Sequence, residues 1–193
     1  IDVWDRALAR SHRQGSMFGV LTVHLWRGFT ELRHGELPAA EDSLRAGIEQ
    51  ISLLGGATLD YAHGLLCSTL LARGLPDAAE EALYGIDRPE GTGDGALLWR
   101  MCEIELLLAR RRWEDALAAA LEHAELCDWR TNPAYAQTLS FQAQALDGLS
   151  RREEALEVLG RELEAAERWG ASGAIGRVLR VRGEILREEG MAD

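Results

Sequence analysis

A short segment centred on Ala79 recurs along this chain at a nearly constant interval. Its counterparts are centred on Ala40, Ala116 and Ala155, and the successive intervals are 39, 37 and 39 residues. Repetition with a period of about 20–50 residues, in a chain without the alternating pattern of β-strands, is typical of stacked helix-turn-helix units. The sequence therefore predicts an all-α array of antiparallel helix pairs.

Two further sets of residues repeat together with these alanines. The residues twelve positions before each alanine are mostly small, and those four positions after it are apolar. The first set is Gly28, Cys67, Ile104 and Ala143, and the second is Leu44, Leu83, Ala120 and Leu159. Because the distance between two packed helices depends on the side chains at the contact, small residues allow a close approach. We expect the same buried interface in every helix pair.

Apolar residues spaced three or four apart predict ten helices separated by Gly- and Pro-containing breakers. The expected ranges are 1–12, 18–33, 37–54, 59–73, 76–86, 96–112, 113–127, 134–149, 151–169 and 172–188. The segment Asp87–Gly95 holds three glycines and one proline and is predicted to be a loop. We expect a single repeat domain over residues 1–193. The start at Ile1, and a last helix without a following partner, indicate a fragment of a longer chain.

The charge of the chain argues against some classes of partner. Acidic residues outnumber basic ones by 32 to 21, and the net charge is −11. Such a charge opposes binding to nucleic-acid phosphates and to anionic lipid. No stretch approaches the roughly 18 apolar residues of a membrane span, and no signal peptide opens the chain. We expect a cytoplasmic protein whose segment contacts neither membrane nor nucleic acid.

The first helices of successive pairs line the concave face in superhelical arrays of this kind. Polar and aromatic residues on these helices, 18, 15 and 11 positions before each alanine, are candidates for ligand contact. The predicted ligand-binding residues are Phe29, Tyr61, Ser68, Met101, Glu105, Gln137 and Gln144. A solvated helix face contains the same mixture of side chains, and Phe29 and Met101 also fit a core role.

Reactive side chains do not gather into a recognisable catalytic or metal-binding pattern. His24 and His63 share a repeat position, but no carboxylate set completes a metal site, so packed histidines are the simpler interpretation. His63 and Cys67 have the spacing that can bring a base to a thiol, although a small core cysteine fits this repeat position better. The remaining cysteines, Cys102 and Cys127, form no Cys-x-x-Cys motif. We expect no catalytic residue, no metal and no cofactor.

Two basic or turn-like motifs allow more than one interpretation. Arg110–Arg112 followed by Trp113 could grip an anionic partner, or could stabilise the carboxyl end of a helix. The segment Gly148–Ala155 is similar to the opening of a DNA-binding helix-turn-helix. The residues that follow continue as one amphipathic helix without a basic recognition helix, which argues against DNA binding.

The C-terminal third is similar to a known family. The segments that carry the similarity are 132–134, 142–148, 152–155, 162–171 and 174–183. They resemble the tetratricopeptide-like region of large bacterial LuxR-type, ATP-binding transcriptional regulators, the maltose-activator-like family. The resemblance implies a tetratricopeptide-like superhelix, placed between an ATPase and a helix-turn-helix that these residues do not contain. The repeat interval is longer than the 34 residues of the standard tetratricopeptide unit.

From the family resemblance we expect a non-enzymatic sensor or interaction domain of a transcriptional regulator. It would bind a small-molecule effector, or a protein or peptide partner, on its concave face, and self-association is also open. The alternative is a stand-alone tetratricopeptide adaptor that docks a peptide or protein and has no role in transcription. The resemblance supplies no ligand-binding motif for these positions.

Overall fold

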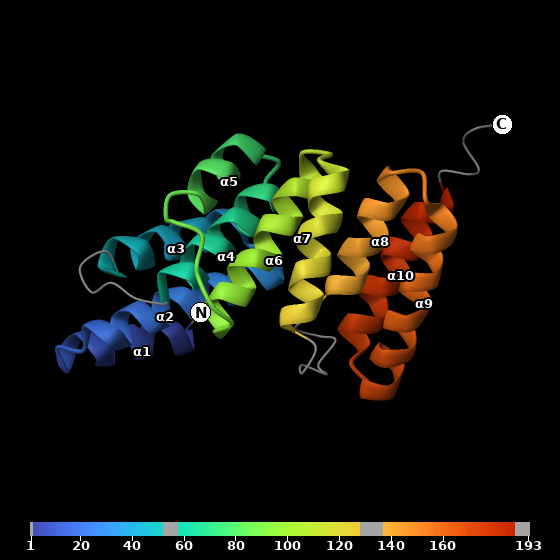
Figure 1. Cartoon of the computed structure of the whole chain (residues 1–193). Coiled ribbons are helices and arrows are strands. Elements are labelled where there is room, and N and C mark those ends of the chain that lie inside the picture. Colours follow the sequence, from blue (N-terminus) through green and yellow to red (C-terminus); the bar gives the residue numbers. More distant parts are fainter. Residues whose placement is uncertain (1, 52–57, 128–136, 188–193) are drawn as a thin grey trace. The chain divides into compact units, whose positions relative to one another are not determined.

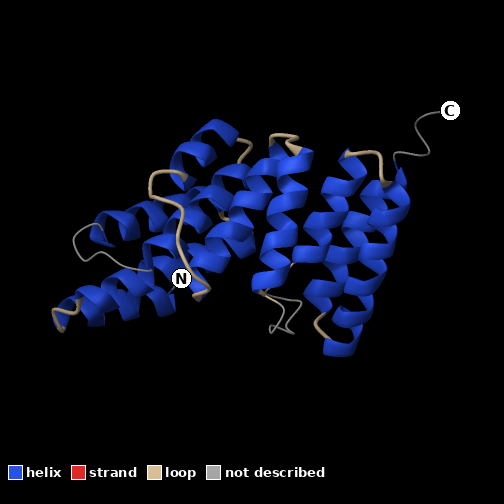
Figure 2. Cartoon of the chain, viewed as in Figure 1, coloured by secondary structure: helices blue, strands red, loops and turns tan. Residues whose placement is uncertain are grey.

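The computed structural model describes residues 2–51, 58–127 and 137–187 (Figure 1). All regular structure in these ranges is helical, so the predicted all-α class is confirmed (Figure 2). The helices are α1 (Asp2–Arg13), α2 (Met17–His34), α3 (Leu37–Ile51), α4 (Thr58–Ala72), α5 (Pro76–Leu83), α6 (Asp94–Ala109), α7 (Trp113–Leu126), α8 (Thr138–Gly148), α9 (Arg152–Trp169) and α10 (Ser172–Arg187).

Most predicted helix boundaries agree with the structure to within about two residues, which is the usual uncertainty of a helix end. Two ends within the described residues differ by more: α6 was expected to reach residue 112 but ends at Ala109, and α5 was expected to reach residue 86 but ends at Leu83. Its last bond runs from the backbone N–H of Tyr84 to the carbonyl oxygen of Glu80, and a turn follows. The predicted ends at 54 and 188, and the predicted starts at 1 and 134, lie outside the described residues.

The chain divides into two compact units, Ile1–Leu106 and Leu107–Asp193. The boundary falls inside α6, so the first unit contains α1 to α5 and most of α6, while the second contains the end of α6 and α7 to α10. Helices that are consecutive in the chain pack against each other within the units: α2 on α3, α4 on α5, α7 on α8 and α8 on α9. The expected superhelix and the expectation of one domain stay predictions.

Four helix-to-helix turns have the same backbone geometry. Each contains a residue with positive φ, five positions before a repeat alanine: Gly35, Gly74, Arg111 and Ser150. In each turn the N–H of this residue bonds three positions back, and the next N–H bonds five positions back, at 2.8–3.1 Å. This is the Schellman motif, which satisfies the last carbonyl groups of a helix. The four predicted hairpins are therefore closed by one type of turn.

The repeat alanines, and the residues that repeat with them, are buried. All four have an exposed fraction of 0%, and the residues four positions later are equally buried. The residues twelve positions earlier are buried as well. The closest approach is at Gly28, where an added Cβ atom would lie 2.6 Å from Cγ of Leu44 and 3.2 Å from the carbonyl oxygen of Ala40. Burial of the repeat positions is therefore confirmed in every hairpin, and direct contact between them is shown for α2 with α3 and for α8 with α9.

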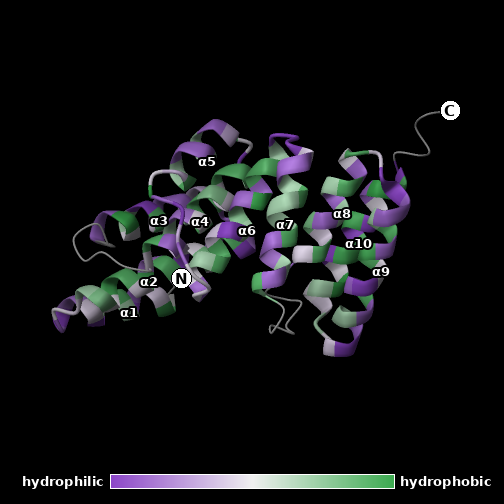
Figure 3. Ribbon diagram, in the orientation of Figure 1, coloured by the Kyte–Doolittle hydropathy of each residue, from purple (hydrophilic) through white to green (hydrophobic). Residues whose placement is uncertain are grey.

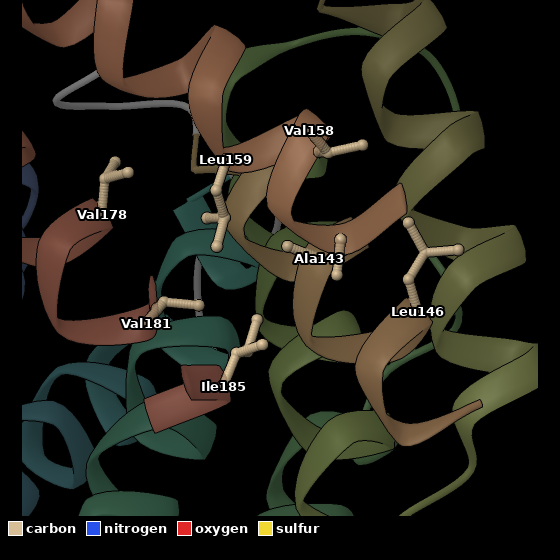
Figure 4. Packing of buried hydrophobic residues seen from close by; sticks show 8 residues of the cluster. Ala143, Leu146, Val158, Leu159, Val178, Val181 and Ile185 are labelled. Carbon is tan, nitrogen blue, oxygen red and sulfur yellow. The ribbon is translucent and has the colours of Figure 1, made fainter. Parts of the chain in front are cut away.

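The second unit has its core where α8, α9 and α10 meet. Ala143 and Leu146 of α8 lie against Leu159 of α9 and against Val178 and Val181 of α10 (Figure 4). In the first unit α4 is largely apolar (Figure 3), and its buried residues are Ala62, Gly64, Leu65, Leu66, Cys67, Thr69 and Leu70. Burial of this apolar surface, at about 25 cal/mol per Å², is the main stabilising contribution in both units.

Candidate functional site

Three aromatic side chains form a partly exposed cluster on α2 and α4. The rings of Trp26 and Phe29 meet edge to face with a centroid distance of 5.8 Å. The ring of Tyr61 lies 6.3 Å from that of Trp26, at an interplanar angle of 51°. Trp26 is 43% exposed, whereas Phe29 and Tyr61 are half-buried. Edge-to-face and tilted pairs of this kind are favourable arrangements of aromatic rings. Two predicted ligand-binding residues, Phe29 and Tyr61, are thus brought together through Trp26.

A polar pair joins α4 to α6 in the same unit. The hydroxyl group of Ser68 donates a hydrogen bond to the Oε2 atom of Glu105, and it lies 3.2 Å from the Sγ atom of Cys102. Ser68 and Glu105 are half-buried, and both were predicted to contact ligand. They occupy the same repeat position, eleven residues before Ala79 and Ala116. The structure therefore places side by side two residues that the repeat register had matched.

Tyr61 and Ser68 lie on the same side of α4, because residues seven positions apart are separated by almost two full helical turns. This side of α4 carries the aromatic cluster towards α2 and the polar pair towards α6. We call the residues Trp26, Phe29, Tyr61, Ser68 and Glu105 the α2–α4–α6 face. It offers ring surfaces for stacking and, because the Ser68 proton is already donated to Glu105, hydroxyl and carboxylate oxygens that accept hydrogen bonds from a ligand.

The other predicted residues lie elsewhere. Met101 is buried in the first unit, as its core interpretation requires. Gln137 and Gln144 belong to the second compact unit. Gln137 precedes α8 and makes no side-chain capping bond, and the amide group of Gln144 donates to the carbonyl oxygen of Ser140 at 3.2 Å. These three residues are not part of the α2–α4–α6 face as described.

The residue that sequence reasoning missed is Trp26. Its repeat position, fourteen before the alanine, holds Leu65, Cys102 and Phe141 in the other helix pairs, and all three are buried. The register therefore marks Trp26 as a core residue. A pattern within α2 itself could have indicated an exposed Trp26: Phe18 and Trp26 are eight residues apart and lie on one side of this helix. Phe18 is 68% exposed, which extends the apolar surface along this helix.

The two thiols of the first unit are held in their protonated form. Burial raises the pKa of Cys67 and of Cys102 well above the usual value, and the nearby Glu105 carboxylate raises both further. A nucleophilic cysteine requires the opposite shift. The spacing of His63 and Cys67 therefore reflects packing of a small core residue.

The histidines of the shared repeat position have different surroundings. The Nδ1–H group of His63 donates to the carbonyl oxygen of Ala82 at 2.6 Å. His24 has a buried Nδ1 atom that finds no hydrogen-bond partner within the described ranges. Burial lowers the pKa of His24, the charges of Arg27 and His12 lower it further, and Glu31 raises it. Among the described residues, no three His, Cys, Asp or Glu side chains are arranged to hold a metal ion.

A hollow of about 330 Å³ lies between α3, α4 and α5. Its walls combine the charged groups of Arg45, Glu49 and Glu81 with His63 and with apolar residues such as Leu66. Because positively and negatively charged side chains both line this open hollow, its lining indicates no single class of ligand. Sequence analysis gave no indication of this hollow, which is formed by second helices as well as by a first helix.

A buried polar cluster joins α7 to α8 in the second unit. The Nδ1 atom of His123 lies 2.9 Å from the hydroxyl oxygen of Thr138, and the Sγ atom of Cys127 lies 3.6 Å from Nε2 of the same imidazole. His123 is 2% exposed. A buried polar group is stable only when it is hydrogen-bonded, so Thr138 allows the imidazole to occupy the helix interface.

Helices long and apolar enough to cross a bilayer do not occur in the described part of the chain. We compared the sequence with models of known protein families and with curated proteins, and neither comparison gave a match. The described residues define the chain by its fold alone, as an all-α protein built from helical hairpins.

Proposed function

We propose that this chain is a non-enzymatic interaction domain that binds a ligand on the α2–α4–α6 face. The observation that carries the proposal is the exposed ring of Trp26, which meets Phe29 edge to face and Tyr61 at a tilt, while Tyr61 shares one side of α4 with Ser68 of the Ser68–Glu105 pair. Exposed aromatic rings flanked by a few polar groups are a common composition of recognition surfaces.

The rings supply most of the contact area that a ligand would bury. Aromatic side chains bury about 150–250 Å² each when fully covered, and they lose little conformational entropy because they have few rotatable bonds. Here the contacts among the three rings hold them in place before any ligand binds. The Glu105 carboxylate adds a negative charge, so a ligand with an amine, a guanidinium or several hydroxyl groups would be favoured.

The biological setting we propose is sensing within a larger LuxR-type transcriptional regulator of the cytoplasm. The resemblance of residues 132–183 to the helical region of that family supports this setting. In such a protein the ligand is a small effector or a regulatory protein, and its binding biases the conformation of the ATP-binding and DNA-binding modules. The second candidate is a tetratricopeptide adaptor, and the shared hairpin turns support it equally.

Thermal unfolding tests the proposed face. A compound that binds only the folded state raises its stability, by about 2.7 kcal/mol at a hundredfold excess over Kd. We would screen sugars, amino acids, nucleotides and short peptides against the wild-type chain, and repeat each positive assay with Trp26→Ala and Tyr61→Ala. Trp169→Ala is the matched control, since Trp169 is 53% exposed on α9 in the other unit.

The proposal predicts that both variants lose the thermal shift while the Trp169→Ala protein keeps it. A ligand that stabilises all four proteins equally would place the binding site elsewhere. The class of the ligand separates the two candidates, because a metabolite supports the sensor and a peptide supports the adaptor.

A further inference from the structure

Helix α10 has two sides of different character. Its inner side consists of Ala174, Val178, Val181 and Ile185, which are at most 3% exposed. Of these, Val178, Val181 and Ile185 lie in the core that α10 shares with α8 and α9 (Figure 4). On the outer side Leu179 is 50% exposed and Leu186 is 41% exposed. Two large leucines seven residues apart on one side of a helix form an apolar strip that water solvates poorly.

Helix α8, which precedes α10 by one repeat of 36 residues, packs against a neighbouring helix on each of two sides. One side contacts α7: Thr138 bonds His123, Gln142 bonds the carbonyl oxygen of Ala120, and Ala145 packs with Ala116. The residues 36 positions later are Ala174, Val178 and Val181. These three residues lie on the buried side of α10, so α10 packs on α9 as α8 packs on α7.

The other side of α8 is covered by α9. Ala143 and Leu146 pack there with Ala155 and Leu159, and the Ser140 hydroxyl donates to Glu162 at 2.5 Å. Shifting Leu139, Ala143 and Leu146 by the same 36 positions gives Ile175, Leu179 and Arg182, and Leu186 follows one turn later. In residues 137–187 no helix covers this side of α10. This side of α10 therefore matches the side of α8 that α9 covers, and it is suited to contact with an amphipathic helix similar to α9.

Charge indicates the composition of that helix. α10 carries four arginines and one glutamate, in a chain whose net charge is −11. Arg182 and Arg187 are exposed on or beside the leucine strip, whereas Arg180, next to it, already pairs with Glu184 at 2.7 Å. By contrast α9, which covers the equivalent side of α8, carries six glutamates and three arginines. Complementary charges across an interface favour encounter and fix register, so the face fits an acidic helix.

We propose that the outer side of α10, built on Leu179, Arg182 and Leu186, is a docking site for an acidic amphipathic helix of a partner protein. Small and leucine side chains of that helix pack on the strip, as Ala155 and Leu159 pack on α8. Its glutamates meet Arg182 and Arg187 of α10. This inference goes beyond the ligand face proposed above, which lies in the other compact unit, and either one can fail without the other.

A synthetic peptide with the α9 sequence, Arg152–Trp169, is the probe. Labelled with fluorescein at its amino end, it would be titrated with the whole chain while fluorescence anisotropy is recorded. The variants are Leu179→Glu and Leu186→Glu, and the matched control is Leu121→Glu, because Leu121 on α7 is also 50% exposed. Circular dichroism checks that all variants keep the wild-type helix content.

We expect saturable binding to the wild-type and Leu121→Glu proteins, and binding at least tenfold weaker to the Leu179→Glu and Leu186→Glu proteins. Binding should also weaken as salt is added, because the charge pairs at the rim are screened. A wild-type chain that does not bind the peptide would overturn the proposal. Equal binding by Leu179→Glu would overturn it too, since the peptide would then occupy another surface.

Two further measurements separate this occupant from others. If sedimentation shows a wild-type dimer that Leu179→Glu dissociates, the strip belongs to a second copy of the chain, and the partner-helix proposal is wrong. If the wild-type chain binds phosphatidylserine vesicles through this strip and does not bind the peptide, the occupant is a lipid surface, which also contradicts it.

Discussion

Arg111 and Ser150 hold the same left-handed backbone conformation in two hairpin turns of the second unit, with φ angles of 56° and 62°. The equivalent residues in the first unit are Gly35 and Gly74, with φ angles of 80° and 74°. For a residue with a Cβ atom this conformation costs about 1–2 kcal/mol, whereas glycine adopts it readily. The turn geometry is thus kept in all four hairpins although only two contain the residue that suits it.

Replacing Arg111 or Ser150 by glycine should therefore stabilise the second unit. The relief of strain exceeds the larger chain entropy of glycine in the unfolded state, and we expect a gain of about 0.5–1 kcal/mol in the free energy of unfolding. Urea unfolding followed by circular dichroism measures it. The converse change, Gly74→Ala, should cost about 1 kcal/mol, and a loss of stability in Arg111→Gly and Ser150→Gly would contradict the assigned turn.

Two glycines inside helices should respond to alanine in opposite ways. At Gly28 the new Cβ atom would meet Leu44 and the backbone of Ala40, so Gly28→Ala should destabilise the first unit by about 1–3 kcal/mol. At Gly160 of α9 no atom lies within 4 Å of the new Cβ, and Gly160→Ala should stabilise by about 0.5–1 kcal/mol through helix propensity. Thermal and urea unfolding of both variants checks the difference in sign, and equal effects would exclude a close contact at Gly28.

The buried Glu162 should give the second unit a recognisable pH dependence. Burial raises the pKa of this carboxyl group above its ordinary value of 4.5, against the lowering effects of the Ser140 hydrogen bond and of Arg177. The folded state therefore holds the proton more tightly than the unfolded state. This contribution to stability is fully present below the unfolded pKa, and it is lost as pH rises through the folded pKa.

Glu162→Gln removes this titration, while its amide oxygen can still accept the Ser140 hydroxyl. The free energy of unfolding of the wild type, minus that of the variant, should fall as pH rises from about 4 towards neutrality. Glu154→Gln is the contrast, because the Arg151 hydrogen bond lowers the pKa of this exposed group and its contribution is lost as pH falls. Parallel profiles for wild type and Glu162→Gln would show that Glu162 is not buried.

The three cysteines should be inert in the folded protein. Cys67, Cys102 and Cys127 are at most 6% exposed, and burial raises the pKa of the first two. Because the thiolate is the reactive form, their reaction with an aromatic disulfide reagent should be slow and should accelerate on unfolding in urea. Rapid reaction of one thiol per chain in the absence of urea would contradict the burial of that residue.

The hairpins could be predicted from sequence because their contacts depend on local spacing. Ala79, Cys67 and Leu83 lie within one helix pair, and the small residue that allows close helix approach recurs with the turn. The proximity of Ser68 and Glu105 could also be predicted from sequence, because the two residues share a repeat position. The register alone was enough to place them on neighbouring first helices.

Other features depend on contacts that spacing does not encode. Trp26 shares its repeat position with Leu65 and Phe141, yet only Trp26 is exposed, because exposure depends on which helix lies next to α2. The exposure of Leu179 and Leu186 on the outer side of α10 likewise depends on which helices lie next to α10. Met101 was predicted to contact ligand, but it shares its repeat position with Gly64, where neighbouring first helices approach closely. A Cβ atom added at Gly64 would lie 3.3 Å from the Cα atom of Trp99.

We infer that one helix-pair interface is rebuilt around Ala40, Ala79, Ala116 and Ala155. Substituting leucine for each alanine in turn tests it most directly, with Ala118→Leu as the control because Ala118 is exposed on α7. Urea unfolding should show that every anchor variant loses about 1–3 kcal/mol through overpacking, while the control changes by less than about 0.5 kcal/mol. An anchor that accepts leucine as readily as Ala118 does would contradict the shared interface.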